Sequence, residues 1–139
     1  MNNYTLYNGF SQMVLDYSTK QYGRDYDFIL GLSYKWIERN WFKCRTYINR
    51  LYKNLNNKGW LDGIYVIEYD KNGSLHSHSV ITTDLDYGSM KNHLNRYWGG
   101  RMGVYHLEPY IPNGGMDYYM SKFYSTSKFD FDLIQSSVN

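Results

Sequence analysis

Four residues, 70–73 (DKNG), constrain the fold more than any other part of the sequence, because they lie between two apolar segments. Aspartate, asparagine and glycine favour turns, since their side chains bond to the nearby backbone or permit a positive φ. The flanking segments 63–69 (GIYVIEY) and 75–83 (LHSHSVITT) are rich in β-branched and aromatic residues, which favour strands. The pattern predicts an antiparallel hairpin in the middle of the chain.

Strand and helix signals alternate on both sides of this hairpin. Segment 28–34 (FILGLSY) predicts a buried strand, and segment 103–109 (GVYHLEP) predicts a later one. Apolar residues recur every three or four positions in segments 36–57 and 89–98, which predicts two helices. The order strand, helix, strand, strand, helix, strand matches a ferredoxin-like or RRM-like split βαββαβ pattern. We therefore expect an α+β fold in which a four-to-five-stranded antiparallel sheet carries both helices on one face.

Both predicted helices are amphipathic. The apolar positions of the first are Ile37, Trp41, Cys44, Ile48, Leu51 and Leu55. The second presents Met90, Leu94 and Tyr97 inward and ends at Gly99-Gly100. The basic residues of the first helix that fall largely outside its stripe are Arg39, Lys43, Arg50 and Lys53. A basic helix side of this kind is usually only solvated, but it is also a candidate DNA contact.

The chain of 139 residues fits one domain. We expect an N-terminal extension over 1–26, with one short helix at about 9–20, and a core over 28–124. A C-terminal tail is expected over 125–139, frayed in its last five residues. Segment 112–124 predicts a third helix, which carries adjacent tyrosines and is expected near the open face of the sheet.

Composition narrows the environment and the partners of the chain. Its single cysteine, Cys44, excludes an internal disulfide and a multi-cysteine zinc site, and its place on the apolar stripe indicates a core residue. No signal-peptide pattern and no run of about 18 apolar residues is present, so we expect a soluble protein inside a cell. A net charge of +2 is too small to prove nucleic-acid binding. The 17 tyrosines suit either packing or the stacking of unpaired bases.

Two histidines, His76 and His78, lie two positions apart on the second strand of the hairpin. Side chains alternate along a strand, so both imidazoles project from the same face. If the turn has three loop residues, Glu68 pairs with His76 and joins this face, whereas a two-residue turn would direct it to the other face. Two imidazoles and a carboxylate suit Mg²⁺ or Mn²⁺ with positions left for water and phosphate. An H-x-H pair also occurs by chance, in which case these histidines are ordinary surface residues.

The expected third helix places Tyr119 at the edge of its apolar face and Lys122 one turn further on. A phenol titrates near 10 and is a poor nucleophile at neutral pH unless a cation or a metal assists it. The alternative interpretation is that Tyr119 only packs and Lys122 is solvated. The adjacent Tyr118 leaves the position of a tyrosine nucleophile open by one residue.

Together these segments resemble the HUH endonuclease superfamily, in particular its small rolling-circle replication initiator (Rep) proteins of viruses, phages and plasmids. The resemblance rests on three motifs in order along the chain: LGLSY at 30–34, LHSH at 75–78 facing Glu68, and YMSK at 119–122. The family usually has a bulky apolar residue between its histidines, where this chain has Ser77.

The resemblance, which spans about residues 28–124, implies a metal-assisted tyrosine nuclease. Tyr119 would attack the scissile phosphate of single-stranded DNA, leaving a 5′-phosphotyrosine link and a free 3′-hydroxyl, and the reverse reaction would reseal the strand. Lys122 would neutralise charge near the phosphate. The ligands of the Mn²⁺ or Mg²⁺ ion would be Glu68, His76 and His78.

The same resemblance implies partners and a location. The partners are single-stranded DNA at a replication origin or hairpin, a host polymerase and helicase, and a second copy of the chain in a homodimer; no membrane is involved. The location is the cytoplasm of a prokaryotic host cell, with a viral, phage or plasmid gene. Expected DNA contacts are Tyr34, Lys35, Arg101 and Lys128. His106, on the last strand of the core, is a weaker candidate for the DNA path or the metal.

Two other functions fit the sequence. One is the single-strand DNA transposase of the same superfamily, although its tyrosine is typically followed by a glutamine rather than by the lysine of the Y-x-x-K spacing. The other is a non-enzymatic RRM-like protein that binds nucleic acid through exposed aromatics on its sheet, without cleavage and without metal.

Overall fold

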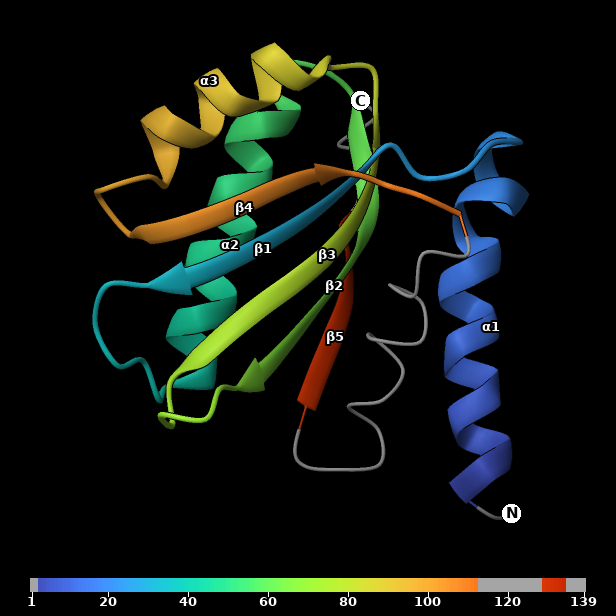
Figure 1. Cartoon of the computed structure of the whole chain (residues 1–139), viewed down its shortest axis with the longest axis horizontal. Helices are drawn as coiled ribbons and strands as arrows, with labels where there is room; N and C mark the ends of the chain where they lie inside the picture. Colours follow the sequence, from blue (N-terminus) through green and yellow to red (C-terminus); the bar gives the residue numbers. More distant parts are fainter. Residues whose placement is uncertain (1–2, 113–128, 135–139) are drawn as a thin grey trace.

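The computed structural model describes residues 3–112 and 129–134 of the chain. Within these residues, three helices pack around a five-stranded antiparallel sheet, and the arrangement can be followed in Figure 1. The helices are α1 (Asn3–Tyr22), α2 (Trp41–Asn56) and α3 (Tyr87–Tyr97). The strands are β1 (Phe28–Tyr34), β2 (Leu61–Tyr69), β3 (Leu75–Thr83), β4 (Gly103–Pro109) and β5 (Phe129–Ile134). The expectation of an α+β fold with an antiparallel sheet is confirmed.

The sheet has the strand order β4-β1-β3-β2-β5, and the β2–β3 hairpin fixes its central register. The amide of Asp70 donates to the carbonyl of Ser74 across 2.7 Å, which encloses a three-residue loop. Gly73 ends this loop with a φ of 82°, a left-handed conformation that costs glycine little. Glu68 consequently pairs with His76, so the register with three loop residues is confirmed.

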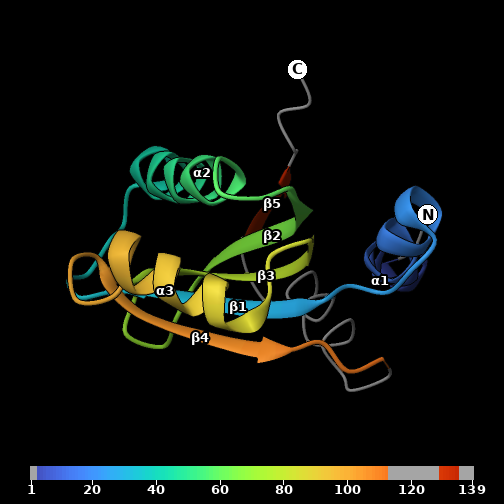
Figure 2. The ribbon, with the colours of Figure 1, turned by 90° about the horizontal axis from the view of Figure 1, so that it is seen from above.

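Helices α2 and α3 cover one face of the sheet, as expected, and α1 lies on the other side (Figure 2). The buried residues of the helical layer are Cys44, Ile48, Leu51, Tyr52, Leu55, Met90, Leu94 and Trp98. They pack on strand residues that alternate along the chain, among them Leu30, Tyr65 and Ile81. Burial of an apolar side chain of this size contributes about 1.5–3 kcal/mol, so this layer holds the main core.

Helix α2 begins at Trp41, five residues after the predicted start. The side chain of Asn40 accepts a hydrogen bond from the amide of Lys43 at 3.0 Å and caps the first turn. The apolar stripe therefore does not extend back to Ile37, which is 56% exposed. The prediction for Cys44 is confirmed: it is fully buried, and burial raises the pKa of its thiol to about 11.

Two other boundaries differ by two residues from those predicted. Helix α3 begins at Tyr87 because Asp86 caps it, accepting a hydrogen bond from the amide of Ser89 at 2.8 Å. Strand β2 begins at Leu61, where pairing with Thr83 extends the hairpin ladder beyond the predicted start. Both differences lengthen elements whose centres were predicted correctly.

The N-terminal helix is longer than the predicted 9–20 segment and covers part of the face expected to be open. Met13, Val14 and Tyr17 pack against a cluster of buried residues on the sheet. The side chains of Ser18 and Thr82 lie 2.6 Å apart and are buried. These contacts join positions far apart in the sequence, so local patterns did not reveal them.

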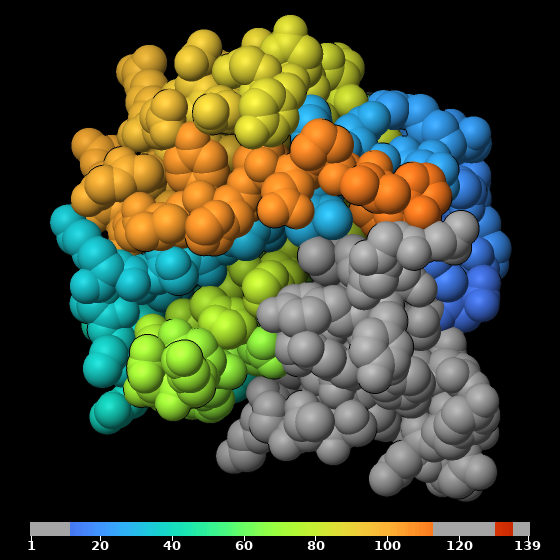
Figure 3. All heavy atoms as spheres, viewed as in Figure 1, coloured from blue at the N-terminus to red at the C-terminus, as the bar shows by residue number. Residues whose placement is uncertain are grey.

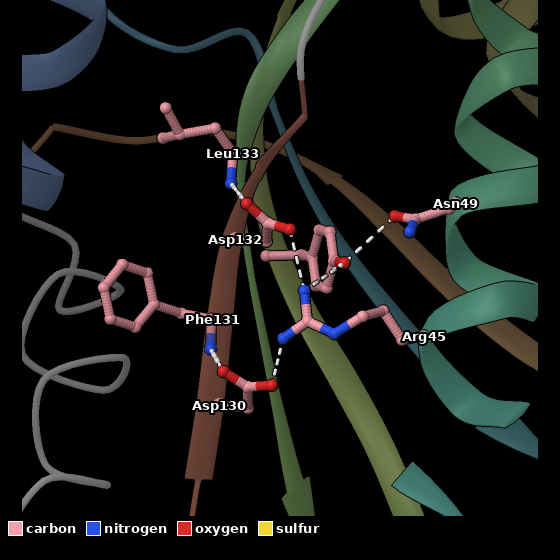
Figure 4. Close-up of polar contacts among 7 residues, drawn as sticks. Arg45, Asn49, Asp130, Phe131, Asp132 and Leu133 are labelled. Carbon is pink, nitrogen blue, oxygen red and sulfur yellow. Dashed lines mark hydrogen bonds and ion pairs between the residues drawn. The ribbon is translucent and has the colours of Figure 1, made fainter. Parts of the chain in front are cut away.

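Residues 129–134, expected as part of a C-terminal tail, form β5 and pair with β2. Arg45 of α2 donates to Asp132 at 2.7 Å and also binds Asp130, and Figure 4 shows both carboxylates turned toward the helix. Phe131 and Leu133 point to the opposite side of the strand (Figure 4). This correction has a sequence signal, because FDFDLI alternates in polarity with the period of a strand.

Within 3–112 and 129–134, no helix has the length and apolar character needed to cross a membrane. The predicted third helix, 112–124, falls almost entirely outside the described residues.

Candidate metal centre

The face of the sheet opposite α2 and α3 carries two histidines and a glutamate on neighbouring strands. His76 and His78 alternate with Ser77 along β3, and Glu68 is paired directly with His76 from β2. Val66 pairs with His78, so the carboxylate lies beside the first histidine and an apolar side chain beside the second. The hairpin register therefore places three ligand-type side chains together.

The ligand atoms of Glu68, His76 and His78 all lie within 4.8 Å of one another. Oε1 of Glu68 is 2.9 Å from Nε2 of His76. The two imidazole centres are 4.9 Å apart, with an interplanar angle of 77°. Glu68 is buried and both histidines are half-buried, so the group is recessed but reaches the surface.

The Glu68–His76 contact restricts the tautomer of His76 when the carboxylate is ionised. An ionised carboxylate only accepts hydrogen bonds, so Nε2 of His76 carries the proton when the two are paired. A ligating imidazole nitrogen carries no proton, so metal binding would replace this hydrogen bond. The same three residues therefore suit either a hydrogen-bonded pair with a neighbouring histidine or a divalent ion.

Gly31 leaves the sheet surface open beside the triad of Glu68, His76 and His78. It pairs with His78 from β1, and a Cβ built on it would lie 3.8 Å from Nδ1 of that histidine. On its other side Gly31 pairs with His106 of β4, which is exposed on the same face. A longer side chain at position 31 would extend into this space, which explains a glycine inside a strand.

Part of this face is seen in Figure 3, where β4 and the tip of the β2–β3 hairpin are at the surface. The donor set fits Mn²⁺ or Mg²⁺: one carboxylate and two imidazoles leave coordination positions for water and phosphate oxygens. The residues present are therefore adequate for the ion that the sequence predicts.

Ser77, which stands where a bulky apolar residue was anticipated, faces the helical layer and is 1% exposed. It pairs with Ile67 and Leu32, and Ile67 belongs to the same buried cluster as Tyr65.

The other predicted site residues are not gathered at the triad. Tyr34 lies on the helical side of the sheet, and its hydroxyl donates to Sγ of Cys44 at 3.1 Å. Burial, and then the nearby thiol, raise the pKa of Tyr34 well above its usual range. Lys35 and Arg101 are exposed near one another, since Nζ of Lys35 donates to the carbonyl of Gly100 at 3.4 Å. The remaining predicted site residues, Tyr118, Tyr119, Lys122 and Lys128, lie outside the described residues.

Sequence reasoning missed Gly31 as part of this face. Its signal was available: an isolated glycine within an apolar strand often marks a close approach of a ligand or of another backbone. His106 was considered for this face, and the register places it there.

Comparisons with protein-family models, curated proteins and solved structures found no match for the chain.

Proposed function

We propose that this protein nicks and rejoins single-stranded DNA with a tyrosine nucleophile and a divalent metal, as a small rolling-circle replication initiator of the HUH type. The observation that carries the proposal is the convergence of one carboxylate and two imidazoles within 4.8 Å on an accessible sheet face. The strand order β4-β1-β3-β2 supports the finer fold included in the proposal, a ferredoxin-like split βαββαβ sheet extended by β5.

Glu68, His76 and His78 would hold Mn²⁺ or Mg²⁺, which when bound polarises a phosphate oxygen. In the proposed reaction the hydroxyl oxygen of Tyr119 forms a bond to phosphorus while the bond to the 3′ oxygen breaks. The phenol proton is transferred, in the net reaction, to the released 3′-hydroxyl. The products are a 5′-phosphotyrosine link and a primer end, and reversal of the same steps reseals the strand. Lys122 would offset charge on phenolate or phosphate.

The proposal includes partners and a location. The substrate is single-stranded DNA at an origin or hairpin, and a host polymerase and helicase would act with the protein, which would work in the cytoplasm of a prokaryotic host. Assembly as a homodimer belongs to the same proposal.

The decisive experiment is a nicking assay on a single-stranded or stem-loop oligonucleotide with Mn²⁺, analysed on a denaturing gel for a protein–DNA adduct. Tyr119→Phe should lower cleavage by at least about a thousandfold and abolish the adduct while DNA binding survives. Tyr118→Phe is the matched control and should retain both. Activity in Tyr119→Phe together with its loss in Tyr118→Phe would transfer the role to Tyr118.

The metal is tested in the same assay. His76→Ala should lower cleavage at least about a hundredfold, because one of three protein ligands is lost. His93→Ala, on α3 and outside the triad, should cleave like the wild type. Undiminished cleavage by the wild type in excess chelator would contradict the metal role. DNA binding with no cleavage and no effect of metal would favour the RRM-like binder.

A further inference from the structure

The helical layer is basic to an extent that the net charge of +2 conceals. Residues 41–56 and 87–102, which form α2, α3 and the turn after α3, contain no aspartate or glutamate. Their basic residues are Lys43, Arg45, Arg50, Lys53, Lys91, Arg96 and Arg101. The 13 acidic residues of the chain lie outside these two segments, and only Asp130 and Asp132 of β5 are seen to turn toward α2, where they neutralise Arg45. The other six basic residues leave an excess of positive charge on the helical layer.

A groove runs between the two helices at this basic surface. Arg50 and Asn54 line it from α2, Tyr97 lines it from α3, and Arg101 lines it from the turn that follows. The indole of Trp98 forms part of its floor and is 1% exposed. The groove therefore has a rigid apolar base and polar walls.

The two guanidinium groups at the groove are available to a ligand. Arg50 and Arg101 are exposed, and neither makes an ion pair or a side-chain hydrogen bond with another described residue. Arg45, five residues before Arg50 in α2, contrasts with them because Asp130 and Asp132 neutralise it. Unpaired arginines that face one groove suit phosphate oxygens, which a guanidinium binds through paired donors.

The aromatic rings of the groove are already engaged. The indole nitrogen of Trp98 donates to the carbonyl of Ser33 at 3.1 Å, and its ring is buried. The guanidinium carbon of Arg96 lies 5.6 Å from the ring centre of Tyr97, and the ring of Tyr47, which also lines the groove, packs against that of Trp36 with the centres 6.0 Å apart. Bases therefore have little free ring surface on which to stack here, and the exposed chemistry of the groove recognises phosphates rather than bases.

We propose that the α2–α3 groove binds the phosphate backbone of DNA independently of sequence, through Arg50 and Arg101. The inference rests on the proposed function, because DNA is the polyanion which that function brings to the protein. The groove lies on the opposite side of the sheet from the triad, so it holds DNA outside the cleavage site. It anchors the strand or the duplex that flanks the nick.

The test measures the affinity of the full chain for random-sequence fluorescent DNA against salt concentration, with chelator present so that no cleavage occurs. Single-stranded and duplex probes of equal length form two arms. Arg50→Ala/Arg101→Ala should weaken binding about tenfold near 0.1 M salt and reduce the slope of log affinity against log salt by about 1.5, as expected for two lost phosphate contacts. The effect should appear in at least one arm, which identifies the form of DNA held.

Two matched variants separate the groove from general charge. Lys43→Ala/Lys53→Ala removes two exposed charges from the same helix outside the groove and should change the slope much less. Arg50→Lys/Arg101→Lys keeps both charges and should retain the slope, which a purely structural role would not predict.

Equal affinities and slopes for wild type and Arg50→Ala/Arg101→Ala with both probes would overturn the proposed DNA-binding role of the groove. An equal loss of affinity and slope in Lys43→Ala/Lys53→Ala would also overturn it. Failure of the proposed nuclease has a different signature, since wild-type DNA binding in chelator would persist without an adduct in the nicking assay.

Discussion

At the scale of single residues, the serine between the two histidines lowers the stability of the fold, and none of the three candidate metal ligands needs its hydroxyl. The hydroxyl of Ser77 is buried and has no hydrogen-bond partner among the described residues. An unsatisfied buried polar group costs about 1–3 kcal/mol in mutational data. Ser79, the next residue on the same face of β3, is equally buried, but its hydroxyl is bonded to that of Tyr52. The two serines therefore form a natural comparison.

Ser77→Ala should raise the free energy of unfolding by about 1 kcal/mol, because the unsatisfied hydroxyl is removed and no contact is lost. Ser79→Ala should lower it by a similar amount, since the hydroxyl of Tyr52 loses its partner. Urea unfolding followed by tryptophan fluorescence measures both changes. A loss in Ser77→Ala as large as that in Ser79→Ala would mean that Ser77 makes a stabilising hydrogen bond.

At the scale of elements, one buried carboxylate of the sheet binds two tyrosines of α1. Asp62 of β2 is 5% exposed and accepts hydrogen bonds from the hydroxyls of Tyr17, at 3.0 and 3.1 Å, and of Tyr22. Burial, followed by the negative charge of Asp62, raises the pKa of Tyr17 to about 12. The bond requires the protonated phenol, so the attachment of α1 weakens at alkaline pH.

The sign of this dependence follows from the two pKa values of Tyr17. The folded value is above the unfolded value of 10.0, so the contribution of Tyr17 is complete below pH 10 and decreases as pH rises toward 12. Tyr17→Phe should lower the free energy of unfolding by about 1 kcal/mol at pH 8, and its difference from wild type should narrow above pH 10. Tyr87→Phe, whose side chain is 44% exposed, should show no such narrowing. Denaturant unfolding at pH 8, 9.5 and 11 gives the comparison, and a difference that widens with pH would contradict it.

The elements also show which structural features can be predicted from local sequence patterns. The hairpin turn determined the register, and the register brought Glu68 to His76, so the arrangement of the triad was predictable from a few adjacent residues. The start of α2 was not predictable in this way, because the backbone of Glu38 forms hydrogen bonds with Ser74 and Leu75, which lie far along the chain. Strand β5 was missed for the same reason.

The alternating polarity of β5 is visible in the sequence, but the sequence does not show which strand it pairs with. Arg45, which binds Asp130, lies 85 positions away, and nothing local connects the two segments. The length of α1 likewise depends on contacts with β2 and β3. The sequence patterns thus predicted features that adjacent residues determine, such as the hairpin register. The edge strand β5 and the extent of α1 depend on contacts between residues far apart in the sequence.

At the scale of the whole molecule, the sheet separates two surfaces of different chemistry. One face carries the triad beside the region covered by α1, and the other carries the basic helical layer. The strands between them are tightly hydrogen-bonded, so a ligand on the triad face stabilises the entire sheet rather than a loop. Metal binding should therefore be measurable as global stability.

A ligand that binds only the folded chain adds RT ln(1 + [L]/Kd), about 2.7 kcal/mol at a hundredfold excess over Kd. Saturating Mn²⁺ should thus raise the Tm of the wild type by roughly 5–15 °C. The rise should vanish in His76→Ala and in Glu68→Gln, and it should persist in His93→Ala, which leaves the triad intact. The change in Tm on adding metal is the quantity to compare, because removal of His76 also deprives the buried Glu68 of its hydrogen bond and lowers the starting Tm. An unchanged Tm of the wild type in Mn²⁺ and Mg²⁺, or an equal rise in His76→Ala, would leave the Glu68–His76 contact as a structural hydrogen bond and remove the metal from the proposed reaction.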